Sequence, residues 1–115
     1  MLDLNDIISM LPFSISEDDY ELLTGVDNSD PNAQNDLAQL FMECNKFESA
    51  HYWFRQAADQ QHADAMQNLS TLYHKGLGIE KNKSEALTWL LKAATQGHII
   101  AKEQLKAFLN PNTPL

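Results

Sequence analysis

Apolar residues in the second half of the chain recur at the spacing of an α-helix. In two stretches they fall at positions i, i+3, i+4, i+7 and i+8: Ala50, Trp53, Phe54, Ala57 and Ala58, and then Ala86, Trp89, Leu90, Ala93 and Ala94. This pattern predicts two helices, each with one apolar stripe that packs against a neighbour. Because no run of alternating β-branched residues occurs, we expect no β-sheet.

A second pattern, Leu-x-x-Leu followed by an aromatic residue, precedes each stripe and marks a repeat. Leu37, Leu40 and Phe41 recur 32 residues later as Leu69, Leu72 and Tyr73, whereas the Trp-containing stripe recurs at an offset of 36. A third, partial copy begins at Ala101. We therefore expect first helices at 31–44, 63–75 and 99–109, and the first two of these pair with the Trp-containing helices that follow them.

Residues at the helix ends support these boundaries. Asp30 followed by Pro31 is a typical N-cap with proline at the first helical position, and Asn82 is placed to cap the second Trp-containing helix. Gly97 can supply the left-handed residue that ends that helix. In the earlier copy Gln61 must take the same conformation, at a cost in free energy.

One stretch, residues 65–101, carries a longer motif. It comprises Ala65, Leu69, Ser70, Tyr73, Gly76, Gly78, Ile79, Ala86, Trp89, Lys92, Ala93, Ala94, Gln96 and Gly97. This motif resembles the Sel-one-like repeat, a relative of the tetratricopeptide repeat, with Ser70 at a usual glycine and Ile79 at a usual valine. Residues 33–65 match more weakly because they lack the Gly-x-Gly segment. The resemblance implies an all-α fold: a short α-solenoid of antiparallel helix pairs, with about two and a half repeats.

Such an array has to be closed at both ends, because each helix pair exposes an apolar surface to the next. Residues 1–30 do not match the repeat, and their apolar positions and capping signals predict an acidic N-terminal helical cap. Residues 31–110 are the expected repeat array, and 111–115 form a C-terminal tail. Lys106 stands where the earlier copies have Ala38 and Ser70, so we expect no partner helix to pack at that position.

Charge is divided unevenly along the chain. The formal net charge is −8, yet residues 1–45 hold ten acidic residues and no Lys or Arg, whereas 46–115 hold six acidic residues and eight basic ones. The absence of clustered bases argues against direct nucleic-acid binding. Apolar runs are too short for a membrane span or a signal peptide. The single cysteine excludes a disulfide framework, and a reducing cytoplasm is expected.

Two surfaces are candidates for binding a protein. The first surface is the base-free part of the chain, residues 1–45, which has no Lys or Arg and whose carboxylates would steer a basic partner. The candidates are Asp18, Asp19, Glu21, Asp27 and Asp36. The resemblance implies that the first helices line a concave groove that holds a peptide. The groove candidates are Asn35, Gln39, Met42, Gln67, Thr71 and His74, with Glu103 in the third copy. The alternative is that these polar residues simply form solvated helix faces.

Nothing in the sequence predicts catalysis, a metal or a cofactor. His62 and His98 occupy equivalent repeat positions, which indicates a recurring structural contact. Neither His51 nor His74 has an acid or a second histidine four residues on, as a metal-binding helix face requires. Cys44 is interpreted as a small, half-buried side chain. Because no acid, base and nucleophile converge, we expect no enzyme.

The resemblance implies a non-enzymatic protein–protein interaction module, an adaptor or scaffold. The alternative is a bacterial immunity protein that neutralises a basic toxin or effector through the acidic N-terminal half. Under either hypothesis the partner is a protein rather than a nucleic acid or a membrane. The chain itself is expected to be a monomer or a weak homodimer.

Overall fold

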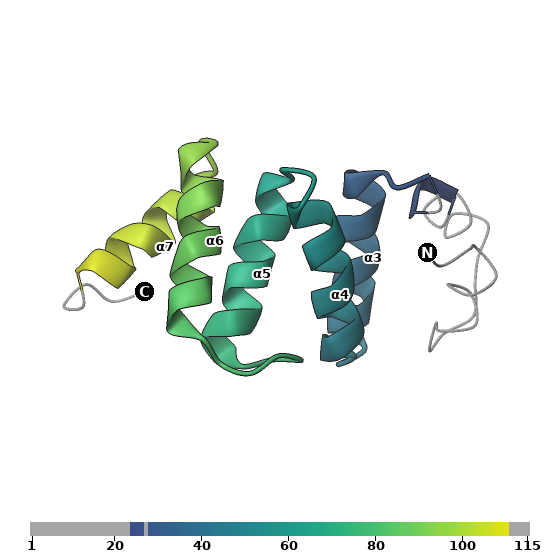
Figure 1. Cartoon of the computed structure of the whole chain (residues 1–115), viewed down its shortest axis with the longest axis horizontal. Helices are drawn as coiled ribbons and strands as arrows, with labels where there is room; N and C mark the ends of the chain where they lie inside the picture. The colour runs from purple at the N-terminus through teal and green to yellow at the C-terminus, as the bar shows by residue number, and fades with distance from the viewer. Residues whose placement is uncertain (1–23, 27, 111–115) are drawn as a thin grey trace.

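The computed structural model describes residues 24–26 and 28–110, and five helices that lie wholly within these residues follow one another in a row (Figure 1). They are α3 (Pro31–Glu43), α4 (Phe47–Ala58), α5 (Ala63–Lys75), α6 (Lys83–Thr95) and α7 (Ile99–Leu109), and no strand occurs among the described residues. The first helices expected at 31–44, 63–75 and 99–109 are confirmed to within one residue. The predicted N-terminal cap at 1–30 lies mostly outside the described residues, and the tail at 111–115 lies wholly outside them.

Each helix packs against the next, so the chain forms a short α-solenoid. The pairs α3–α4 and α5–α6 are the two repeats, α4 packs against α5, and α7 packs against α6 as the first helix of a third repeat. The predicted all-α solenoid is therefore confirmed. Its first helices, α3, α5 and α7, line one face together, and this face holds the polar contacts described below.

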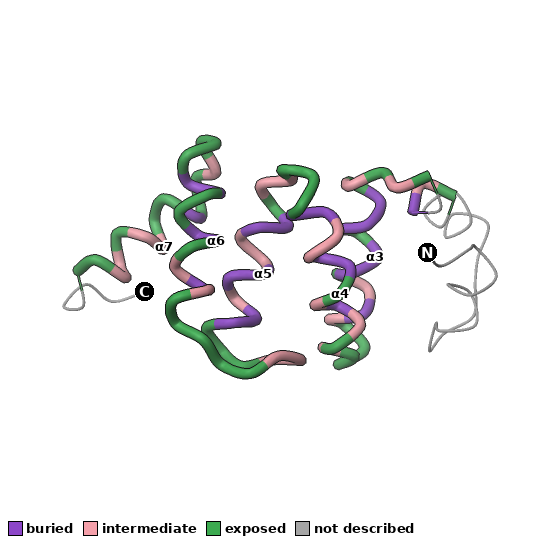
Figure 2. The backbone as a smooth tube through the Cα atoms, viewed as in Figure 1, coloured by how far each residue is buried: buried purple, intermediate pink, exposed green. Residues whose placement is uncertain are grey.

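The core lies where the predicted apolar stripes meet (Figure 2). Trp53 and Phe54 of α4, and Trp89 and Leu90 of α6, are all buried. The alanines of the two stripes are buried as well, which allows neighbouring helices to approach closely. At the usual glycine of the motif, the hydroxyl of Ser70 donates to the carbonyl of Ala86 at 2.6 Å. The serine thus ties α5 to α6 without widening their contact.

The helix ends follow the capping signals of the sequence. The Asp30 carboxylate accepts from the backbone N–H of Asn32, and the Asn82 amide oxygen accepts from that of Glu85. Gly97 is left-handed, and Gln61 takes the same conformation with φ of 69°. The left-handed residues predicted after α4 and α6, Gln61 and Gly97, are therefore confirmed.

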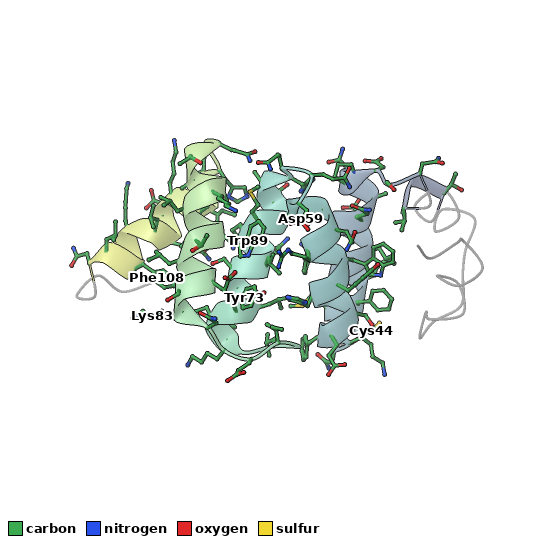
Figure 3. All side chains as sticks on the ribbon, in the orientation of Figure 1. Cys44, Asp59, Tyr73, Lys83, Trp89 and Phe108 are labelled. Carbon is green, nitrogen blue, oxygen red and sulfur yellow. The ribbon has the colours of Figure 1, made fainter. Side chains whose placement is uncertain are left out.

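The Gly-x-Gly segment fits closely against the first repeat. Gly78 has a φ of +71°, and a Cβ atom on it would lie 2.3 Å from the carbonyl carbon and oxygen of Phe47. Only glycine fits this approach of the loop to the start of α4. The prediction for Cys44 was wrong, because its side chain is exposed at the end of α3 rather than half-buried (Figure 3).

Candidate functional site

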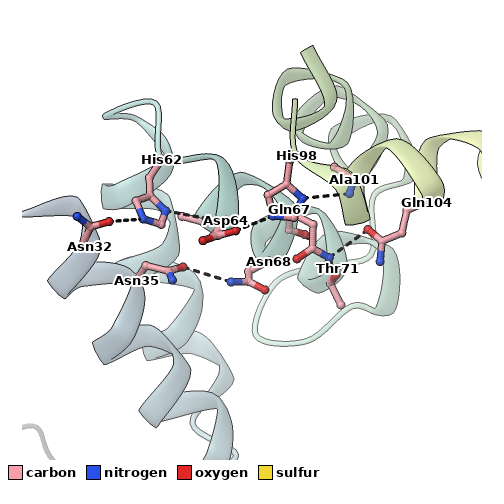
Figure 4. Close-up of polar contacts among 11 residues, drawn as sticks. Asn32, Asn35, His62, Asp64, Gln67, Asn68, Thr71, His98, Ala101 and Gln104 are labelled. Carbon is pink, nitrogen blue, oxygen red and sulfur yellow. Dashed lines mark hydrogen bonds and ion pairs between the residues drawn. The ribbon is translucent and has the colours of Figure 1, made fainter. Parts of the chain in front are cut away.

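Two equivalent histidines connect the first helices of successive repeats (Figure 4). Nδ1 of His62 accepts from the backbone N–H of Ala65 and caps α5, while Nε2 lies 2.8 Å from Oδ1 of Asn32 on α3. His98 repeats this arrangement at the start of α7, and its Nε2 lies 2.6 Å from Oδ1 of Asp64 on α5. The predicted recurring structural contact is confirmed.

Amide side chains extend this polar connection along the same face. Asn68 of α5 donates to the side-chain oxygen of Asn35 at 3.2 Å, and Gln67 donates to the side-chain oxygen of Gln104 on α7 at 3.0 Å. Asn35 is only 7% exposed, so its predicted exposure on the groove was wrong. The reason is that α5 packs over Asn35, and Asn68 of α5 donates a hydrogen bond to its side-chain oxygen. Gln67 is half-buried and also contacts Thr71.

The remaining groove candidates separate into two groups. Thr71 and His74 of α5, with Glu103 of α7, line one common groove. Gln39 is exposed and Met42 half-buried on α3, and neither lines that groove. The structure therefore brings together the candidates of the second and third repeats and leaves those of the first repeat apart.

This groove between α5 and α7 has a volume of about 1000 Å³. Its α5 side is Ser70, Thr71, His74 and Lys75; its α7 side includes Ile99, Ile100, Glu103, Gln104, Lys106, Ala107, Phe108, Leu109 and Asn110. Ile99, Ile100 and Leu109 are 76%, 58% and 73% exposed. The His74 ring stands edge-on to Phe108, with 5.1 Å between ring centroids. The groove thus offers apolar surface to solvent beside a few polar groups.

The charged side chains that line the groove have a net positive charge. Nζ of Lys106 lies 3.1 Å from Oε1 of Glu103, so these two side chains neutralise each other. Lys75 lies at the end of α5 and adds a second ammonium group to the lining. An apolar ligand that carries carboxylates matches this lining better than a basic one.

The polar connection between repeats stops at α7. Ile100 occupies the position at which α3 has Asn32 and α5 has Asp64, so α7 offers no oxygen to a following histidine. Lys106 likewise replaces Ser70, whose hydroxyl holds α6. Ile99 and Ile100 were not among the predicted groove residues, although a position-by-position comparison of the three repeats singles them out.

Of the acidic candidates, one lies in the described part of the chain. Asp36 is exposed on α3. The other four, Asp18, Asp19, Glu21 and Asp27, lie outside the described residues. Residues 24–26 and 28–110 hold nine acidic and eight basic residues, so most of the net charge of −8 comes from the rest of the chain.

His51 of α4 is half-buried against Tyr73 of α5. Its Nε2 lies 3.4 Å from the hydroxyl of Tyr73, and the two rings meet edge to face. Partial burial, together with the positive charge of Arg55 one turn away, lowers the pKa of His51. In the described residues no group of three or more His, Cys, Asp or Glu is arranged to hold a metal ion. No helix in that part of the chain is long and apolar enough to cross a membrane.

The fold and its groove define the class of the molecule: a short helical-repeat solenoid with an apolar groove at its C-terminal end. Sequence comparison matches residues 45–62 and 63–98 to the Sel1 repeat. The chain therefore contains Sel1 repeats over residues 45–98, and the resemblance to this family is confirmed. Sel1 repeats generally mediate protein–protein interactions.

Two larger proteins are similar to the chain. An uncharacterised protein of Neisseria meningitidis serogroup B is 32% identical over 93 residues, which are 79% of this chain and 20% of that protein. The crystal structure of a Sel1 repeat protein from Oxalobacter formigenes is 36% identical, with a TM-score of 0.67, over 75% of this chain and 37% of the other. The matched part of the chain thus spans about a fifth of the first relative and somewhat more than a third of the second.

Proposed function

We propose that the protein is a non-enzymatic adaptor that binds a segment of a partner protein in the groove between α5 and α7. One observation carries this proposal. Three of the five large apolar side chains that are exposed in the described residues, Ile99, Ile100 and Leu109, gather on α7 at this groove. Apolar surface concentrated in one place is typical of a protein-binding site.

The lining favours a partner segment with apolar anchors. Ile100 and the His74–Phe108 pair supply apolar contact on the two sides of the groove. Thr71 and Gln104 offer a hydroxyl and an amide to the partner's polar groups. An amphipathic helix or an extended peptide that inserts one or two apolar side chains would bury this surface.

The test places a photo-reactive amino acid at Ile100 and, as a matched control, at Leu91, which is 50% exposed on α6. A protein that crosslinks from position 100 but not from position 91 is purified, and its Kd is measured. We expect Ile100→Lys to weaken binding about tenfold or more, and Leu91→Lys to change it less than about twofold. Equal binding by the wild type and both variants would reject the groove as the binding site.

A second candidate function is neutralisation of a basic toxin or effector by the acidic half of the chain. The uneven charge supports it, since residues 1–45 have no Lys or Arg and Asp36 presents its carboxylate on the surface of α3. A one-signed surface accelerates association with an oppositely charged protein. This hypothesis predicts an association rate that falls steeply with salt.

Charge reversal separates this candidate from the first. The test variant reverses three acids of the base-free part, Asp18, Asp19 and Glu21; its control reverses three exposed acids of the repeats, Glu48, Asp59 and Glu80. We expect the first triple variant to slow association about tenfold or more and the second to slow it less. Equal association rates for the wild type and both triple variants would eliminate the electrostatic hypothesis.

A cytoplasmic location is part of the proposal. The free cysteine in the described residues, Cys44, is exposed, and a reducing compartment keeps such a thiol from oxidising. Fractionation of cells that produce the protein tests this location. Recovery of the protein outside the cytoplasm would contradict it.

A further inference from the structure

We propose that the groove between α5 and α7 receives residues 2–11 of a second copy of this chain, so that copies associate head to tail. This inference rests on the proposed function, because it assigns an occupant to the same groove. It is carried by the apolar surface of α7, by the charge balance of the groove, and by the sequence of the segment.

The apolar positions of the segment suit a helix that lies in a groove. Leu4, Ile7, Ile8 and Leu11 fall at i, i+3, i+4 and i+7, which places them on one stripe if the segment is helical. The groove presents Ile99, Ile100, Phe108 and Leu109 as the complementary surface. Burying one apolar stripe against another is the usual way in which a helix binds a groove.

The charges of the two surfaces are also complementary. Asp3 and Asp6 accompany the apolar stripe, and the segment has no base. The groove contributes Lys75 in addition to the internally neutralised pair of Lys106 and Glu103. A carboxylate of the segment near Lys75 would gain attraction and meet no unpaired like charge.

The arrangement of the helices favours residues 2–11 of a second copy, rather than those of the same molecule, as the occupant of the groove. The described chain begins beside α3, whereas α7, which forms one side of the groove, is the last helix of the row (Figure 1). The long axis of the molecule measures 47 Å. To place residues 2–11 along α7 of their own molecule, residues 12–23 would have to run along much of this axis, and their full extension is about 40 Å. Head-to-tail contact between copies requires no such stretching, and it leaves a free groove and a free segment at the ends of each assembly.

Sedimentation velocity of the full chain over a range of concentrations tests this inference. We expect the average sedimentation coefficient to rise with concentration, and to fall again when salt is added. Ile100→Lys and Lys75→Glu should each weaken association about tenfold or more. Their matched controls are Leu91→Lys and Lys83→Glu, which make the same changes on α6 outside the groove; both should associate like the wild type.

A charge exchange identifies the segment itself. The double variant Asp3→Lys, Asp6→Lys should weaken association about as much as Lys75→Glu, and the triple variant should recover most of the loss. Circular dichroism of each variant verifies that the helices remain folded. A folding defect caused by these changes would persist or worsen in the triple variant. Recovery of association would therefore show that the exchanged charges face each other.

Three outcomes would overturn the inference. They are a chain that stays monomeric at every concentration, an association that Lys75→Glu and Ile100→Lys leave unchanged, and an association that the Asp3 and Asp6 changes leave unchanged. In the last case the groove would pair with another surface. If copies do not associate and Ile100→Lys still abolishes binding of the crosslinked partner, this inference fails and the proposed function stands.

Discussion

The imidazole of His98 joins two successive repeats through both of its nitrogens. Nδ1 accepts the backbone N–H of Ala101 at 3.1 Å, and Nε2 lies 2.6 Å from Oδ1 of Asp64. Because Nδ1 is an acceptor, the proton of the neutral ring is on Nε2, which donates to the carboxylate. His62 makes the same pair of contacts one repeat earlier, with Asn32 as its acceptor.

Replacing Asp64 tests how much this contact contributes to stability. Asp64→Ala removes the acceptor and should lower the free energy of unfolding by about 1 kcal/mol. Asp64→Asn retains an acceptor oxygen, as Asn32 does for His62, and should remain close to the wild type. Urea unfolding followed by circular dichroism measures both. If the two variants are equally destabilised, the charge near the start of α5 matters rather than the hydrogen bond.

The helices could be predicted from the sequence because their signals are local. Periodic apolar positions determine which residues form each helix, and a capping side chain such as Asn82 acts on a backbone N–H only three residues away. The left-handed residues Gln61 and Gly97 follow from the same local reasoning, since a helix that turns back at once needs one.

The candidate site could be predicted only in part, because exposure depends on neighbours that a periodic pattern does not identify. Asn35 lies on the polar side of α3, yet α5 covers it and Asn68 bonds to it. Ile100 is apolar and exposed because it replaces the acceptor found at Asn32 and Asp64. Polarity alone therefore predicts Asn35 as a binding residue, although it is covered, and does not predict Ile100, although it is exposed.

Two glycines with positive φ should respond differently to alanine. A Cβ on Gly78 would lie 2.3 Å from backbone atoms of Phe47, so the loop or the start of α4 would have to move. A Cβ on Gly97 would meet no atom within 4 Å. We expect Gly97→Ala to cost about 1 kcal/mol from backbone strain alone, and Gly78→Ala to cost clearly more. Thermal unfolding compares the two, and equal losses would show that the close approach of Gly78 to Phe47 is relieved without cost.

Gln61 offers a substitution that should stabilise the protein. Its φ of 69° is strained for a residue with a side chain, and Gly97 occupies the equivalent place in the next repeat with φ of 88°. Gln61→Gly should raise the free energy of unfolding by up to about 1 kcal/mol, because relief of strain exceeds the added flexibility of the unfolded chain. Gln60→Gly is the control at a neighbouring position without positive φ, and it should destabilise. A lower melting temperature for Gln61→Gly than for the wild type would contradict the strain.

His51 should make stability fall as the solution becomes acidic. Burial and the charge of Arg55 lower its pKa in the folded protein, whereas the unfolded chain has the ordinary value of about 6.5. As the pH falls below about 6.5, the unfolded state therefore binds a proton that the folded state still excludes, and unfolding becomes easier. His51→Gln removes this titration while retaining a polar side chain near Tyr73. The wild type should lose more stability than the variant between about pH 7 and pH 5, because only the wild type carries the His51 imidazole. Denaturant unfolding at several pH values measures the difference, and parallel curves for the two proteins would show that His51 takes up its proton equally readily in the folded and unfolded states.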